Sequence, residues 1–140
     1  PRHAVKISFY LDEKTSVTFP LSRLSRLELE FYKFSGKLGL EELKRGARVP
    51  GVNKSLLAIV PIEEGHVEFS VLGREREVAR LLGVSLDIVE ERVSVLTRRD
   101  EVGRTGVFVH RVIAPEDSVT RVVEEIARRN PLFRKKLEIA

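Results

Sequence analysis

The chain has 140 residues, a formal net charge of +4 and a sequence pI near 9.6. With 42% hydrophobic and 33% charged residues, the composition predicts a globular protein and excludes a disordered one. The absence of cysteine excludes disulfides, thiolate catalysis and cysteine-ligated zinc. No stretch approaches the roughly twenty apolar residues that span a bilayer, and no N-terminal signal segment is visible. We therefore expect a cytoplasmic protein without membrane association, with residues 1–140 forming a single compact domain.

Two further features of the composition concern habitat and charge. The chain has no methionine, tryptophan or glutamine, and its 17 arginines outnumber its 8 lysines, which is typical of thermophilic proteins. The charge is uneven, with a net of +5 in residues 1–54, −4 in residues 55–97 and +3 in residues 98–140. An electrostatic footprint for nucleic acid would therefore belong mainly to the two ends of the chain.

The first half of the chain predicts a hairpin followed by two helices. Apolar residues alternate with polar ones from Val5 to Leu11, a turn follows, and Val17 and Phe19 begin a returning strand. Pro20 suits the first turn of a helix, whose apolar residues recur at helical spacing up to residues 35–36. A short helix is expected over residues 40–45, and residues 47–54 form a loop.

The second half predicts another hairpin and more helices. A buried strand over residues 55–62 and an alternating strand from Val67 to Val71 form the hairpin. Helices follow over residues 74–82 and 85–97, then a polar loop over 98–106 and a strand over 107–113. Pro115-Glu116-Asp117 opens a further helix, and a last short helix follows Asn130-Pro131.

This order of elements predicts an α+β fold, with two β-hairpins each followed by helices, then a C-terminal strand and helices. An offset of fifty residues aligns several apolar and acidic positions, such as Glu13 with Glu63 and Phe19 with Phe69. An internal β-β-α-α duplication, with halves 1–50 and 51–100 and a C-terminal extension 101–140, is one interpretation of this match.

The most informative stretch is the pair of helices around Gly83-Val84-Ser85. Gly83 can adopt the left-handed conformation that ends a helix, and Ser85 is a favourable N-cap for the next. Leu86, Val89 and Val93 then recur at helical spacing. Residues 74–97 resemble the winged-helix, helix-turn-helix domains of leucine-responsive-type prokaryotic regulators, in which such a turn precedes a recognition helix. The resemblance implies DNA binding and transcription regulation.

The charge of this predicted recognition helix argues against strong base recognition. Its groove-facing positions would fall on Asp87, Glu90, Glu91 and Ser94. Carboxylates are repelled by the phosphates that line the groove, although one could accept a hydrogen bond from a cytosine amino group.

Basic residues outside the acidic third are the other nucleic-acid candidates. Arg98, Arg99 and Arg104 lie where a winged helix has its wing, and could contact phosphates. The same loop contains Gly103-Arg104-Thr105-Gly106, which is similar to the Gly-x-x-Gly loop of KH RNA-binding domains. A second cluster, near the C-terminus, comprises Arg128, Arg129, Arg134, Lys135 and Lys136. A third comprises Lys37, Lys44, Arg45, Arg48 and Lys54. Each has an alternative interpretation as an ordinary solvated charged surface.

Catalytic and metal-binding patterns are not apparent in the sequence. His3, His66 and His110 are isolated and lack the spacing of a metal pair. Neighbouring glutamates are common in so charged a chain and are weak evidence for acid–base catalysis. Tyr10, Phe31, Tyr32 and Phe34 could stack on bases, although their spacing favours a place in the core. We expect a protein that is not an enzyme and has no metal or cofactor.

Two hypotheses follow from the sequence. The first is a non-catalytic nucleic-acid-binding protein that holds duplex DNA, or RNA, through the helix-turn-helix segment and basic loops, with a homodimer supplying enough contacts. Its proposed contacts are Arg98, Arg99, Arg104, Arg128, Arg129, Lys135 and Lys136. The second is a protein–protein interaction or assembly module that uses the same helices as a scaffold, with the acidic Asp87, Glu90 and Glu91 docking a basic partner.

Overall fold

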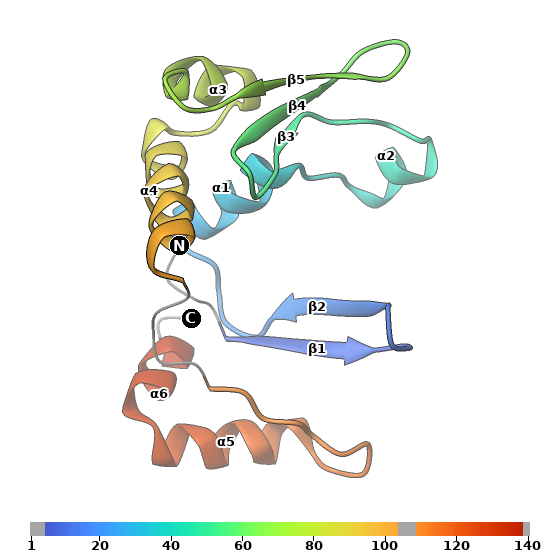
Figure 1. Cartoon of the computed structure of the whole chain (residues 1–140). Helices are drawn as coiled ribbons and strands as arrows, with labels where there is room; N and C mark the ends of the chain where they lie inside the picture. The colour runs from blue at the N-terminus through green and yellow to red at the C-terminus, as the bar shows by residue number, and fades with distance from the viewer. Residues whose placement is uncertain (1–4, 104–108, 139–140) are drawn as a thin grey trace. The chain divides into compact units, whose positions relative to one another are not determined.

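The computed structural model describes residues 5–103 and 109–138 and has the predicted α+β fold, with helices and two antiparallel sheets (Figure 1). The chain divides into two compact units. One comprises Ser25–Thr105, and the other comprises Arg2–Leu24 together with Gly106–Ala140. The single domain over residues 1–140 and the internal duplication stay predictions. Within the described ranges, no helix is long and apolar enough to cross a membrane.

The sheet of the first unit has three antiparallel strands in the order β3-β4-β5. They are β3 (Gly51–Val52), β4 (Leu57–Pro61) and β5 (His66–Ser70). The prediction of an uninterrupted loop over residues 47–54 is wrong, because Gly51 and Val52 pair with Ile59 and Ala58. Two residues are too short a run to show strand periodicity, and this strand forms only through its tertiary partner.

The helices of this unit are α1 (Arg26–Ser35), α2 (Leu40–Lys44), α3 (Glu75–Leu82) and α4 (Leu86–Val102). The prediction that a helix starts at Pro20 is wrong, because this proline is the last residue of a strand and faces Lys6. The helix begins after Ser25, whose hydroxyl accepts a hydrogen bond from the Glu28 N–H while the Glu28 carboxylate accepts one from the Ser25 N–H. This capping box satisfies two otherwise unpaired backbone donors.

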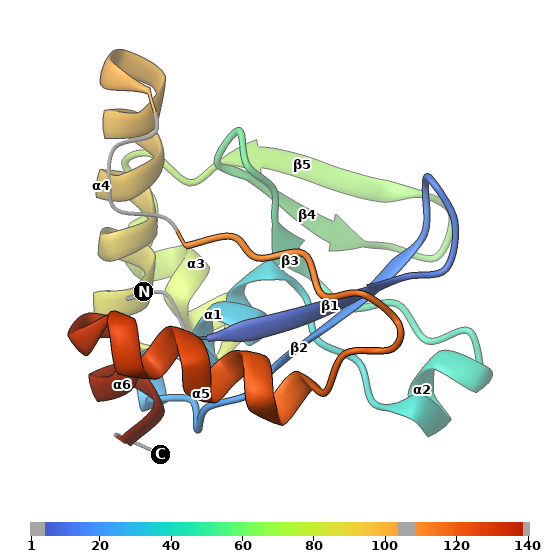
Figure 2. The same ribbon diagram turned by 90° about the horizontal axis from the view of Figure 1, so that it is seen from below.

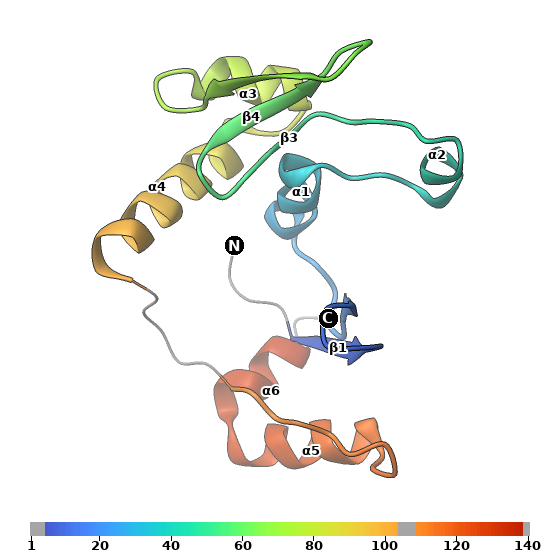
Figure 3. The same ribbon diagram turned by 45° about the vertical axis from the view of Figure 1, so that its right-hand side comes forward.

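The core of the first unit joins α1, the sheet and the α3–α4 pair (Figure 3). Its buried hydrophobic residues are Phe34, Val52, Leu56, Ala58, Val71, Val78, Ala79, Leu82, Ile88, Val89 and Leu96. Close packing of α1 on β3 requires glycine at position 51, because a Cβ there would lie 2.6 Å from the Ser35 carbonyl oxygen. The core therefore holds α1 against the elements from which the candidate site is built.

The second unit contains the hairpin β1 (Lys6–Tyr10) and β2 (Ser16–Pro20), together with the helices α5 (Val119–Arg129) and α6 (Pro131–Glu138) (Figure 2). Two predictions are wrong here. Residues 109–113, the described part of the predicted strand 107–113, form no strand. Pro115-Glu116-Asp117 forms a turn, and the helix begins at Val119, where the Ser118 hydroxyl accepts a hydrogen bond from the Arg121 N–H. The serine hydroxyl satisfies one of the first N–H groups of the helix, which have no partner within the helix.

Candidate functional site

The turn between α3 and α4 has the geometry that its sequence predicts. Gly83 is left-handed, with φ 60° and ψ 44°, and ends α3. Its N–H donates to the Arg80 carbonyl at 3.2 Å, while the Val84 N–H donates to the Ala79 carbonyl at 3.0 Å. The Ser85 hydroxyl then accepts a hydrogen bond from the Ile88 N–H and caps α4. Local chemistry therefore fixes where one helix stops and the next begins.

Side chains from α1 hold this turn. The Lys33 ammonium donates a hydrogen bond of 2.8 Å to the Gly83 carbonyl oxygen. The Ser85 hydroxyl donates to the Glu30 carboxylate, which also pairs with Arg26 at 3.5 Å. The carbonyl at the end of α3 and the N-cap of α4 are thus both bonded to one helix, which gives the turn a fixed place on the core.

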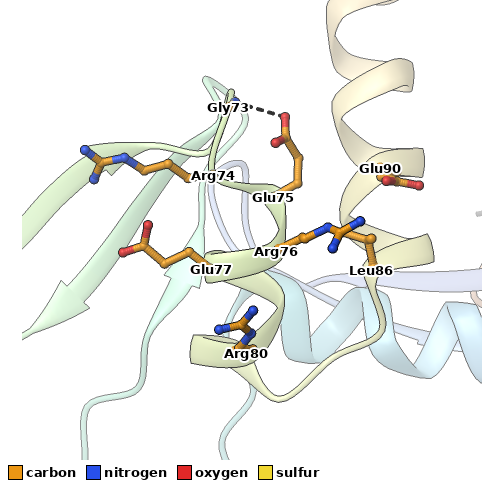
Figure 4. A pocket seen from close by; sticks show the side chains of 8 residues that line it. All are labelled: Gly73, Arg74, Glu75, Arg76, Glu77, Arg80, Leu86 and Glu90. Atoms are coloured by element: carbon orange, nitrogen blue, oxygen red, sulfur yellow. Dashed lines mark hydrogen bonds between the residues drawn. The ribbon is translucent and has the colours of Figure 1, made fainter.

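Three exposed arginines follow one another along α3 and its N-cap, at positions 74, 76 and 80. They line a pocket of about 480 Å³ together with Gly73, Glu75, Glu77, Leu86 and Glu90 (Figure 4). The Arg76 side chain extends toward Leu86 and Glu90, whereas Glu77 extends to the other side of α3 (Figure 4). The Glu75 carboxylate accepts a hydrogen bond of 3.0 Å from the Gly73 N–H. The pocket is therefore lined by both positively and negatively charged side chains.

Arg74 differs from the other two arginines because its guanidinium lies over the Phe69 ring, 5.4 Å from the centroid. A cation–π contact of this kind holds the side chain against the sheet. Within the described part of the chain, the Arg76 and Arg80 guanidinium groups form no ion pair or hydrogen bond. These two side chains are therefore the better placed to meet a phosphate.

The first turns of α4 expose an acidic face, largely as the sequence predicts. Asp87, Glu90 and Ser94 are exposed, while Ile88 and Val89 are fully buried. Glu91 is half-buried, so the prediction that it faces a groove with the others is wrong. A spacing of one residue turns a helical side chain by about 100°, which carries Glu91 from the exposed face toward the core.

Arg98 and Arg99 do not lie in a wing. Both belong to α4, which continues to Val102, and the prediction of a polar loop from residue 98 is wrong. Arg98 is exposed and Arg99 is half-buried. Arg104 and the second glycine of the KH-like loop lie outside the described residues. The wing interpretation fails for two of its three arginines because charged residues with good helix propensity extend the helix beyond Leu96.

Arg92 is a half-buried charged residue of α4. Its guanidinium lies 5.0 Å from the centroid of the Phe31 ring on α1. Burial lowers the pKa of the Arg92 guanidinium, the neighbouring Glu91 opposes this shift, and Arg99 adds to it. The Phe31 ring is covered by Arg92 and touches Tyr32 edge-on, and Phe34 is buried, so these aromatics serve packing.

The C-terminal basic cluster lies on α5 and α6 in the second unit. Arg128, Arg129 and Arg134 each pair with a glutamate on their own helix, at 4.0, 3.3 and 3.7 Å. Lys135 is exposed and Lys136 half-buried. The internal pairs partly neutralise this cluster, and exposed pairs of this kind contribute little to stability.

The five residues of the third basic cluster, at positions 37, 44, 45, 48 and 54, are all exposed. Arg48 donates hydrogen bonds to the carbonyl oxygens of Ile62 and Gly65, so it fastens the β4–β5 turn. Lys44 pairs with Glu41 at 3.0 Å. Lys37 lies before α2, and Lys54 lies in the turn between β3 and β4.

No group of three or more potential metal ligands comes together among the described residues. His66 bonds to Glu68 at 3.0 Å on the exposed side of β5, and His3 lies outside the described residues. Tyr10 is exposed on β1 in the other unit.

Sequence reasoning missed the arginines of α3, because the charge of residues 55–97 is negative as a whole. The spacing of the individual arginines could have identified them. Arg76 and Arg80 are four residues apart and thus share one face of a helix, while Val78, Ala79 and Leu82 form the buried side. Net charge over a segment does not resolve faces of a helix, and the helical period does.

Comparisons with models of known families, with curated proteins and with solved structures found no match for this chain.

Proposed function

We propose that this protein binds duplex DNA through α3 and α4, with the arginines of α3 contacting phosphates. The observation that carries the proposal is the capped turn at Gly83–Ser85, held from α1, with Arg76 and Arg80 exposed beside it. In helix-turn-helix proteins the first helix crosses the sugar–phosphate backbone while the second enters the major groove. Guanidinium groups on the first helix suit this contact because they bind phosphate with two parallel hydrogen bonds.

The acidic face of α4 limits the kind of DNA binding that this site supports. Asp87 and Glu90 are exposed at the end of the helix that would approach the bases. Coulomb repulsion from phosphates opposes close approach of both carboxylates. We therefore expect binding that depends on phosphate contacts, with weak sequence preference. Arg98, Arg99, Arg104, Arg128, Arg129, Lys135 and Lys136 remain further proposed phosphate contacts.

The test is fluorescence anisotropy of a labelled duplex with the purified full chain over a series of salt concentrations. Arg76→Ala/Arg80→Ala should weaken binding and reduce the slope of log K against log salt by about 1.8, at about 0.9 for each phosphate that is no longer neutralised. Arg121→Ala/Arg111→Ala removes the same charge from exposed positions of the second unit and serves as the matched control. Equal slopes for the two variants would refute the role of α3, and no binding at low salt would refute DNA binding.

A second candidate function is docking of a basic protein partner on the acidic face of α4. The observation that favours it is the same exposure of Asp87 and Glu90. These carboxylates oppose DNA binding, but they would attract the positive charges of a basic partner. A partner held in this way should dissociate when Glu90 is replaced by Lys, whereas DNA affinity should stay unchanged or rise. The loss of partner binding and the unchanged or higher DNA affinity after this substitution therefore distinguish the two functions.

A further inference from the structure

The hairpin β1–β2 has one apolar and one polar face. Ile7 lies opposite Phe19, and Phe9 lies opposite Val17, so these four side chains share a face. The rings of Phe9 and Phe19 stack with centroids 5.5 Å apart. On the other face the hydroxyls of Ser8 and Thr18 hydrogen-bond at 2.6 Å.

Much of the apolar face is exposed. The exposed fractions are 46% for Phe9, 69% for Leu11, 51% for Val17 and 44% for Phe19. At ~200 Å² for an aromatic side chain and less for valine and leucine, these fractions leave on the order of 300–400 Å² of apolar surface on this face. This size matches the largest patch that a typical monomer exposes, and such patches commonly mark interaction sites.

The hairpin also lacks further strands. Within the described residues β1 and β2 pair with each other alone, in a two-stranded sheet. An isolated two-stranded hairpin is marginally stable in water, and a packed apolar face is needed to stabilise it. A surface that covers Phe9 and Phe19 would supply this packing.

We propose that a second copy of this chain covers the face, with the Phe9–Phe19 stack of each copy meeting that of the other across a two-fold axis. Two such faces together bury on the order of 600–800 Å², which with a rim of neighbouring side chains approaches the lower limit of about 1,000 Å² for a specific interface. An interface of this size fits a weak and reversible dimer. Self-complementary patches are the basis of two-fold interfaces.

The chemistry of the face favours a second copy over nucleic acid. Proteins that stack bases on aromatic rings place cations beside them for the phosphates. The residues of the apolar face are all uncharged, so it carries neither Lys nor Arg: Ile7, Phe9, Leu11, Val17 and Phe19. An uncharged face leaves no charge to desolvate when it packs against its equal.

The test is sedimentation velocity of the full chain without nucleic acid, from low to high micromolar concentration. The wild type should form a dimer, and Val17→Lys, which keeps both rings and places a charge at the centre of the face, should weaken it by at least about tenfold. Thr18→Lys puts the same charge on the adjacent residue of the polar face and should leave the dimer unchanged. Circular dichroism with thermal unfolding checks that each variant is folded.

A wild-type chain that is monomeric throughout this range would overturn the proposal, and its apolar face would then belong to contacts within one chain. A dimer that tolerates Val17→Lys as well as Thr18→Lys would overturn it too. Because the measurement contains no DNA, its result is independent of the proposed function.

Discussion

The Lys33 ammonium on α1 donates a hydrogen bond of 2.8 Å to the carbonyl oxygen of Gly83, fifty residues away in sequence. That carbonyl belongs to the left-handed residue that ends α3. Helix ends leave carbonyl groups without intrahelical partners, and a lysine amine is a favourable donor to them. The Glu30 carboxylate on the same helix accepts a hydrogen bond from the Ser85 hydroxyl, so α1 binds both sides of the turn.

Replacing Lys33 with Met should lower the free energy of unfolding by about 1 kcal/mol, because the variant cannot form this exposed hydrogen bond from a charged donor. Urea denaturation followed by circular dichroism measures the change. Lys37→Met is the matched control, since Lys37 lies just beyond the end of the same helix and is exposed. A decrease of equal size in both variants would show that the Gly83 contact does not stabilise the turn.

Ser85→Ala should cost about 1 kcal/mol, the usual effect of removing an N-cap hydroxyl. Ser85→Thr keeps an acceptor for the Ile88 N–H and should recover much of that stability. If Lys33→Met and Ser85→Ala act on one turn, their combined effect should differ from the sum of the single effects. Strict additivity in the double variant would mean that the two contacts are independent.

Gly51→Ala should destabilise the first unit by about 1–3 kcal/mol, because the new Cβ overlaps backbone atoms of Ser35 and Gly36 that cannot move aside cheaply. Gly39→Ala is the control, since Gly39 has a negative φ and a Cβ there meets the flexible end of Glu42. Thermal unfolding compares the two. A Gly51→Ala protein as stable as the control would contradict the close approach of α1 and β3.

Glu90→Gln should raise affinity for duplex DNA several-fold at low salt if α3 and α4 bind DNA, because one carboxylate no longer repels the phosphates. Glu101→Gln removes the same charge from the last turn of α4, away from the capped turn, and should have a smaller effect. Fluorescence anisotropy measures both. Equal affinities for these two variants and the wild type would argue against contact between the start of α4 and DNA.

Asp12 makes the β1–β2 turn sensitive to acid. Hydrogen bonds from the Lys14 N–H and from Thr15 hold the pKa of the Asp12 carboxyl below its ordinary value. Since the folded pKa is below the unfolded one, the carboxylate stabilises the turn above the unfolded pKa of about 3.9. This stabilisation is lost as pH falls through the folded pKa.

The stability difference between wild type and Asp12→Asn should therefore be present at neutral pH and shrink in acid. Titration of the Asp12 carboxyl carbon by NMR checks the direction of the shift. A midpoint at or above that of the unfolded chain would contradict the turn geometry. Glu13→Gln, at the neighbouring exposed position, is the control.

Elements with strong local signals were predictable. The two hairpins, the short helix α2 and the helices on either side of Gly83 were predicted, because their alternation, helical spacing and capping residues are local properties of the chain. The errors fell at boundaries. A polar stretch such as residues 98–102 has no apolar stripe to mark it as helix, and it became part of α4.

The sequence by itself determined where α3 stops and α4 starts, since glycine tolerates a positive φ and serine caps a helix whatever surrounds them. The acidic character of the exposed face of α4 followed from the same helical period. Tertiary structure decided that β3 pairs at all, and that Lys33 and Glu30 reach the turn. Such contacts join residues separated by up to 55 positions, and no local pattern encodes which distant side chain will fill a given place in the packed core.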